Sequence, residues 1–156
     1  MKPITFLSAI AISILLAQLV RADKEAIPSS FVVTSEYGQS FFKMIPSKGK
    51  WQENKYVTTK EAFGVAYSID EEGNLKELWK TSGWYSSELY LSLDGQFLVR
   101  MGPWNKGHEP NNSDLAVAFY KNGNLLKEYS VIDLVKDKSK IQPTTSHYFG
   151  LPEWTS

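Results

Sequence analysis

Short runs of β-branched and aromatic residues alternate with turn residues between residues 30 and 130. Runs of about four to eight such residues, bounded by Gly, Asn or Asp, are typical of β-strands. Tight turns in which glycine takes a positive φ are expected at Gly38, Gly73, Gly95 and Gly123. The pattern predicts two groups of four strands: residues 31–34, 40–45, 63–69 and 75–81, then residues 88–91, 97–101, 115–120 and 125–130.

The two groups are related by a sequence repeat of 57 residues, from Ser35 to Ser92. Residues 35–47, SEYGQSFFKMIPS, align without a gap on residues 92–104, SLDGQFLVRMGPW. Further matches follow in the same order: residues 30–34 fall on 87–91, Val65-Ala66-Tyr67 on Val117-Ala118-Phe119, and residues 73–75 on 123–125. Self-similarity at a fixed interval indicates a repeat architecture.

The remaining segments complete a predicted division of the chain. Residues 1–22 form a signal peptide, 23–29 a flexible N-terminus, 30–86 the first repeat, 87–138 the second repeat, and 139–156 a C-terminal tail or an incomplete third repeat. The connections 47–62 and 104–114 are expected to be loops, and residues 131–137 read as a short helix. The expected fold class is all-β, with two four-stranded antiparallel repeat units.

The N-terminal segment predicts export. Lys2 precedes an apolar run from Ile4 to Val20, and Val20-Arg21-Ala22 places small or apolar residues at the positions before a signal-peptidase cleavage site. The alternative is an uncleaved anchor helix, because an apolar run of 17 residues is at the lower limit of what spans a bilayer. With cleavage, we expect a periplasmic or extracellular protein without stable membrane insertion.

Composition narrows the possible partners. Cleavage leaves 134 residues with a net charge of −2, because the removed segment carries two basic residues and no acid. Such a chain lacks the basic footprint of a nucleic-acid binder. It contains no cysteine, so neither a disulfide nor a thiolate metal site can form. Eight Tyr, eight Phe and five Trp residues must therefore supply much of the stabilising packing.

The segment from Leu91 to Val99, LSLDGQFLV, resembles the strand pair of WD40-like and YVTN-type bacterial repeats. The chain is also similar, over residues 30–130, to bacterial exported proteins of unknown function with β-propeller-blade-like repeats. The resemblance implies blade-like four-stranded units. Two blades cannot close a ring, because propellers have about four to eight. We therefore expect one of three arrangements: the two sheets are blades of a larger assembly, they are the remains of a degraded array, or they stack face to face as a sandwich.

Sequence motifs give little support to catalysis, a metal or a cofactor. His108 and His147 stand apart, and neither cysteine nor a paired-histidine spacing completes a zinc site. The acidic run Asp70-Glu71-Glu72 lacks the EF-hand spacing, and we interpret it as a solvated turn. No nucleophile elbow, P-loop or dinucleotide-binding glycine motif occurs.

One aromatic–polar group is a candidate binding site for an unknown protein or carbohydrate: Trp84, Tyr85, Arg100, Trp104 and His108. Exposed aromatic rings beside an arginine suit the recognition of sugars or peptides, through stacking and bidentate hydrogen bonds. The alternative interpretation is that these rings pack between the two sheets, with Arg100 pointing outward.

The sequence therefore favours an exported, non-enzymatic, β-rich binding or structural domain. One alternative is an interaction subunit that pairs through its strand edges. Another is a hydrolase whose acid pair is assembled from loops. Strand alternation further predicts that Met44 and Met101 lie on the buried faces of their sheets, with Lys43 and Arg100 on the opposite faces.

Overall fold

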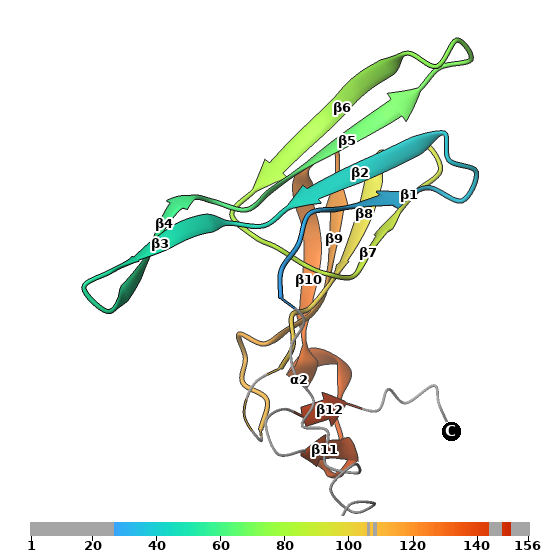
Figure 1. Cartoon of the computed structure of the whole chain (residues 1–156). Helices are drawn as coiled ribbons and strands as arrows, with labels where there is room; N and C mark the ends of the chain where they lie inside the picture. Colours follow the sequence, from blue (N-terminus) through green and yellow to red (C-terminus); the bar gives the residue numbers. More distant parts are fainter. Residues whose placement is uncertain (1–26, 106, 108, 144–147, 151–156) are drawn as a thin grey trace, which may run out of the picture.

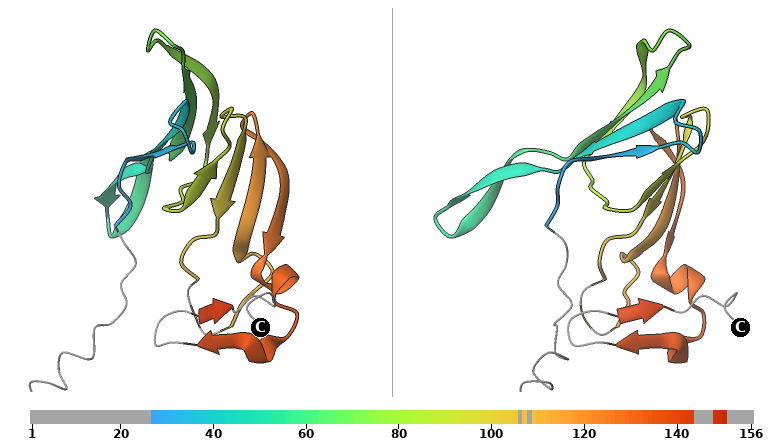
Figure 2. Two further views of the ribbon diagram at one scale, coloured as in Figure 1. Left: turned by 90° about the vertical axis from the view of Figure 1, so that its right-hand side faces the viewer. Right: turned by 45° about the vertical axis from the view of Figure 1, so that its right-hand side comes forward.

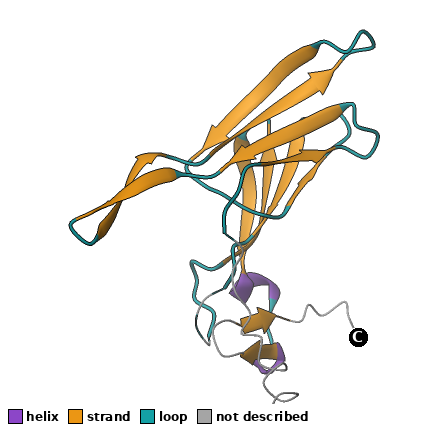
Figure 3. Ribbon diagram, in the orientation of Figure 1, coloured by secondary structure: helices purple, strands orange, loops and turns teal. Residues whose placement is uncertain are grey.

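The computed structural model describes residues 27–150 except 106, 108 and 144–147 (Figure 1). These residues form an antiparallel β structure with little helix, as Figure 3 shows. The first sheet has the order β1 (Phe31–Thr34), β2 (Ser40–Ile45), β5 (Phe63–Ile69) and β6 (Leu75–Ser82). The second sheet has the order β10 (Asn124–Ser130), β9 (Leu115–Lys121), β8 (Phe97–Met101) and β7 (Leu89–Leu91).

Two further two-stranded sheets correct the prediction that the chain consists of two four-stranded units. Strands β3 (Lys48–Gln52) and β4 (Lys55–Lys60) form a separate two-stranded sheet within the segment 47–62, where a loop was expected. Strand β11 (Ile141–Pro143) pairs with β12 (Tyr148–Gly150). The β3–β4 turn was missed because Glu53 and Asn54, not glycine, take its positive φ angles of 46° and 63°. The predicted helix is one short turn, α2 (Val131–Leu134), capped by Ser130.

The first two strands of each sheet pair in the same way. In the first sheet, the Ser35 amide donates to the Ser40 carbonyl at 2.8 Å, and in the second sheet the Ser92 amide donates to the Phe97 carbonyl at 2.9 Å. Gly38 and Gly95 occupy these two turns with φ angles of 73° and 69°. Each of these matched residues in the second sheet lies 57 positions after its counterpart in the first, as Ser92 does after Ser35.

The third and fourth strands also match, but the sequence alignment of the third strands is wrong by one residue and that of the fourth strands, which placed Leu75 on Leu125, is wrong by two. Tyr67 pairs with Phe41 in the first sheet, and Tyr120 pairs with Leu98 in the second. Tyr67 therefore corresponds to Tyr120 and not to Phe119. The unequal connections before these strands shift the register, which the sequence match over three residues could not detect. Both fourth strands carry a bulge at the matched position, Leu78 in β6 and Leu126 in β10.

The hydrophobic core lies between the two four-stranded sheets, which face each other in Figure 2. Its buried residues include Phe42, Met44, Ala66 and Trp79 from the first sheet and Leu89, Leu98, Ala118 and Tyr120 from the second. Within the described part of the chain, no helix is long and apolar enough to cross a membrane. The predicted signal peptide lies outside the described residues.

The prediction about the two methionines is confirmed in the first sheet and wrong in the second. Met44 is fully buried, whereas Met101 is partly exposed and the buried residue of its strand is Leu98. At matched positions, therefore, the two sheets bury opposite faces. This is the expected result when two similar sheets stack in the same orientation, because the contact then joins one face of the first sheet to the non-equivalent face of the second.

Candidate functional site

Trp84 and Arg100 lie together in the region where the two sheets meet. Trp84 belongs to the connection between β6 and β7, and its ring is nearly parallel to that of Phe42 at 6.4 Å. The Tyr120 ring lies 5.3 Å from it, and the Arg100 guanidinium carbon lies 4.6 Å from its centre. The rings thus pack against the core, as the alternative interpretation of the sequence expected.

Arg100 points toward the first sheet, so the expectation that it points outward is wrong. It pairs with Leu89 and Ala118, both of which are buried. One terminal nitrogen donates to the Tyr120 hydroxyl at 3.5 Å, while its Nε is buried without a hydrogen-bond partner among the described residues. Packing on Trp84, with a cation–π attraction, is therefore the principal contact of this guanidinium.

Tyr85 has a structural role at the edge of the core. Its ring meets that of Phe31 edge to face at 6.3 Å. Its hydroxyl donates to the Ser29 carbonyl at 2.9 Å, and the Ser29 amide lies 3.1 Å from the same hydroxyl. Tyr85 therefore fastens the segment before β1 to the body of the protein.

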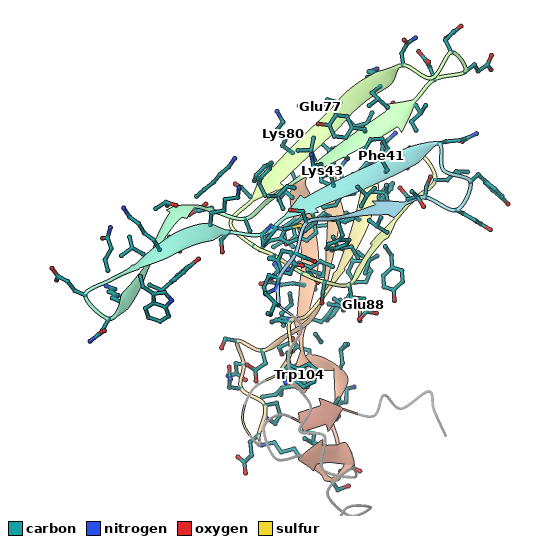
Figure 4. The ribbon with its side chains drawn as sticks, viewed as in Figure 1. Phe41, Lys43, Glu77, Lys80, Glu88 and Trp104 are labelled. Atoms are coloured by element: carbon teal, nitrogen blue, oxygen red, sulfur yellow. The ribbon has the colours of Figure 1, made fainter. Side chains whose placement is uncertain are left out.

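Trp104 lies in the connection after β8, near α2 and away from the packed sheets (Figure 4). It borders an open hollow of about 390 Å³, which is also lined by Asn105, Asn111 and Asp114. His108 and His147 lie outside the described residues. The structure thus brings together Trp84 and Arg100, and places Tyr85 and Trp104 at separate positions.

The acidic segment at residues 70–72 forms a solvent-exposed turn. Asp70 accepts hydrogen bonds from the Asn74 amide at 2.7 Å and from the Asn74 side chain at 3.1 Å. These hydrogen bonds from Asn74 hold the pKa of Asp70 below its ordinary value. Among the described residues, no group of three or more His, Cys, Asp or Glu side chains is arranged to hold a metal ion.

Hairpin β3–β4 carries an exposed aromatic pair that the sequence reasoning missed. Trp51 and Tyr56 are cross-strand partners, and their rings meet at 70° with centres 5.6 Å apart. The exposed fraction is 73% for Trp51 and 45% for Tyr56. The hairpin extends from the body in Figure 1, and among the described residues neither of its strands is hydrogen-bonded to another sheet. The available signal was the alternation of polar and aromatic residues on both sides of Glu53-Asn54.

The same hairpin is positively charged. Residues 48–60 contain four lysines and one glutamate, all of which are exposed: Lys48, Lys50, Lys55, Lys60 and Glu53. Because neighbouring side chains of a strand point to opposite faces, Lys50 and Lys55 project from the face opposite the aromatic pair. Gly49 makes room for the pair, since a Cβ at this position would lie 2.6 Å from the Tyr56 ring. The hairpin therefore has one aromatic face and one basic face.

Comparison with family models, with curated proteins and with solved structures finds no match to this chain. The rings of Trp84 and Tyr85 already pack against other residues of the chain, whereas Trp51 presents most of its surface to solvent. Hairpin β3–β4 is accordingly the better candidate for ligand binding.

Proposed function

We propose that this protein is an exported, non-enzymatic, β-rich binding domain that holds an anionic carbohydrate on hairpin β3–β4. The observation that carries the proposal is the exposed Trp51–Tyr56 pair on a basic hairpin. An aromatic ring stacks against the apolar face of a sugar. The lysines lie on the opposite face of this thin two-stranded hairpin, so they attract the carboxylate, sulfate or phosphate groups of an anionic glycan through their charge, while the aromatic face makes the direct contact.

Two other ligands fit the hairpin less well. A membrane surface would have to accept the tip, but Gln52, Glu53, Asn54 and Lys55 make that tip polar and place an acid at its end. A partner strand would have to pair with an edge of the hairpin, but lysines on both strands disfavour such pairing. A sugar needs neither an apolar tip nor a free strand edge.

The domain that carries the hairpin is, in this proposal, a pair of blade-like repeats. Support comes from the shared four-stranded antiparallel order, the equivalent Gly38 and Gly95 turns and the matched bulges at Leu78 and Leu126. Hairpin β3–β4 is inserted between the second and third strands of the first unit. The repeat thus provides a scaffold, and the insertion provides the binding element.

Export is the second part of the proposal. It is supported by the apolar N-terminal run and by the residues that precede Asp23. Protein recovered from outside the cytoplasm should begin at Asp23 when its N-terminus is sequenced. Recovery of the intact N-terminus in the membrane fraction would indicate an anchored protein instead.

The binding proposal is tested by titrating the purified protein with polygalacturonate, an acidic polysaccharide, and with dextran as the neutral comparison. Calorimetry should detect polygalacturonate binding that weakens as salt is added, because salt screens exposed charges. Trp51→Ala should weaken it at least about tenfold, since a central aromatic contact commonly contributes ~2 kcal/mol or more. The double variant Lys50→Gln/Lys55→Gln should reduce both the affinity and its dependence on salt.

Lys76→Gln is the matched control, because Lys76 is exposed on β6 and does not belong to the hairpin. Equal loss of affinity in the control and in the hairpin variants would contradict the proposal. So would binding to phosphatidylglycerol vesicles without binding to polygalacturonate, because that result would identify a lipid surface as the ligand.

A further inference from the structure

Each of the two large sheets has one face in the core and one outer face. Through the sequence repeat, the outer face of each sheet corresponds to the core face of the other sheet. Face A of the first sheet contains Phe42, Met44 and Ala66 and packs toward the second sheet. Its matched residues in the second sheet are Val99, Met101 and Phe119, and they lie on the outer face. The second sheet therefore presents an apolar counterpart of face A to solvent at these three positions, and Lys127 stands where face A has Trp79.

The converse holds for the first sheet. Face B of the second sheet contains Leu98, Arg100 and Tyr120 and packs toward the first sheet. Its matched residues, Phe41, Lys43 and Tyr67, lie on the outer side of the first sheet, where Phe41 pairs with Tyr67 across β2 and β5. Figure 4 shows Phe41 and Lys43 on this outer side. The two stacked sheets thus have an open face A on one outer side and an open face B on the opposite outer side.

Both open faces are rich in apolar surface. On the second sheet, Tyr90, Phe97 and Phe119 are 55%, 42% and 38% exposed, and the Phe119 ring meets that of Tyr129 edge to face. Its lysines lie over rings of the same face, as Lys121 does over Phe97 at 5.0 Å. Contiguous exposed apolar surface of this kind marks an interaction site.

The open face B is equally suited to being covered. The rings of Phe41 and Tyr67 stack at 5.1 Å, and Val32 beside them is 53% exposed. The nearby Lys80 and Glu77 form an ion pair at 3.1 Å, so this face carries few uncompensated charges. Its remaining cation, Lys43, corresponds to Arg100, which inside the chain lies over an aromatic ring.

We propose that the open face A of one copy of this chain packs on the open face B of a second copy, and so repeats the packing within each chain. The partner is a second copy because face A of the first sheet and face B of the second sheet, which correspond to the two open faces, already pack on each other within the chain. Face A on face B is a head-to-tail contact, which closes into a ring or continues as a filament. With two sheets per chain, a ring of about two to four chains would contain the usual number of propeller blades.

The experiment is a native mass measurement of the purified full chain over a range of concentrations. The proposal predicts oligomers that dissociate on dilution. Phe119→Asp removes the open face A, and Phe41→Asp removes the open face B, so each variant alone should be monomeric. Tyr90→Asp provides a second face A variant at a more exposed position. Tyr37→Asp, at a 71% exposed position in the turn between β1 and β2 and outside both faces, is the control and should keep the wild-type mass.

Mixing the variants tests the head-to-tail geometry. Phe119→Asp copies retain face B and Phe41→Asp copies retain face A, so an equimolar mixture should form one-to-one dimers and nothing larger. Circular dichroism should show that each variant remains folded. A wild-type protein that stays monomeric at every concentration would overturn the proposal. Oligomers that survive both substitutions, or variants that stay monomeric when mixed, would also overturn it.

Discussion

Replacing Met44 with alanine tests whether the face of β2 that carries Met44 is the one buried in the core. Met44 is fully buried beside Phe42 and belongs to the cluster between the sheets. A Met→Ala change at such a site costs about 2–5 kcal/mol in the free energy of unfolding, because it removes apolar contacts and leaves a cavity. Lys43, the preceding residue, points to the exposed face, where substitutions usually change stability by less than ~0.5 kcal/mol.

Urea denaturation followed by tryptophan fluorescence measures this difference. With a slope of about 1.5 kcal/mol per molar urea, a loss of ~3 kcal/mol lowers the midpoint by roughly 2 M. The midpoint of Lys43→Ala should move by less than ~0.5 M. At dilutions where the chain is monomeric, Met101→Ala should cost less than Met44→Ala, because Met101 is partly exposed. Equal midpoints for Met44→Ala and Lys43→Ala would refute the assignment of faces.

Two further substitutions test local structure. Gly102→Ala should destabilise the protein by about 2 kcal/mol or more, because its Cβ would lie 1.7 Å from the Leu115 carbonyl oxygen; an unchanged melting temperature would contradict this contact. Asp94 has a pKa below its ordinary value, chiefly through the hydrogen bond from Ser92, so its contribution to stability is lost as the pH falls through that lowered pKa. Asp94→Asn should therefore flatten the fall of the urea midpoint between about pH 5 and pH 2, and parallel curves for the two proteins would count against the turn's role.

The sequence predicted the strands of the two large sheets well, because each is a short apolar run that ends at a recognisable turn. Gly38 and Gly95 marked two of these turns, and both have the expected positive φ. The matched residues of β1 and β2 were also placed correctly relative to β7 and β8. Local chemistry determines these features, so they can be predicted without knowledge of packing.

The faces of the second sheet and the binding candidate could not be predicted in this way. Strand alternation divides residues into two faces, but only the stacking of the sheets decides which face is buried. Arg100 was therefore expected to point outward, whereas the first sheet covers its face. Trp51 was overlooked because its hairpin turns at Glu53-Asn54 without a glycine, and exposure cannot be read from the residue type.

The most direct test of the central claim is to record backbone amide NMR spectra of the ¹⁵N-labelled protein during titration with polygalacturonate fragments. If the glycan binds the hairpin, the largest shift changes should fall within residues 48–60, at Trp51 and Tyr56 above all. The amides around Trp84 and Arg100, which belong to the packed core, should change little. Shift changes centred on Trp84, Arg100 or Trp104, with an unchanged hairpin, would contradict glycan binding at hairpin β3–β4.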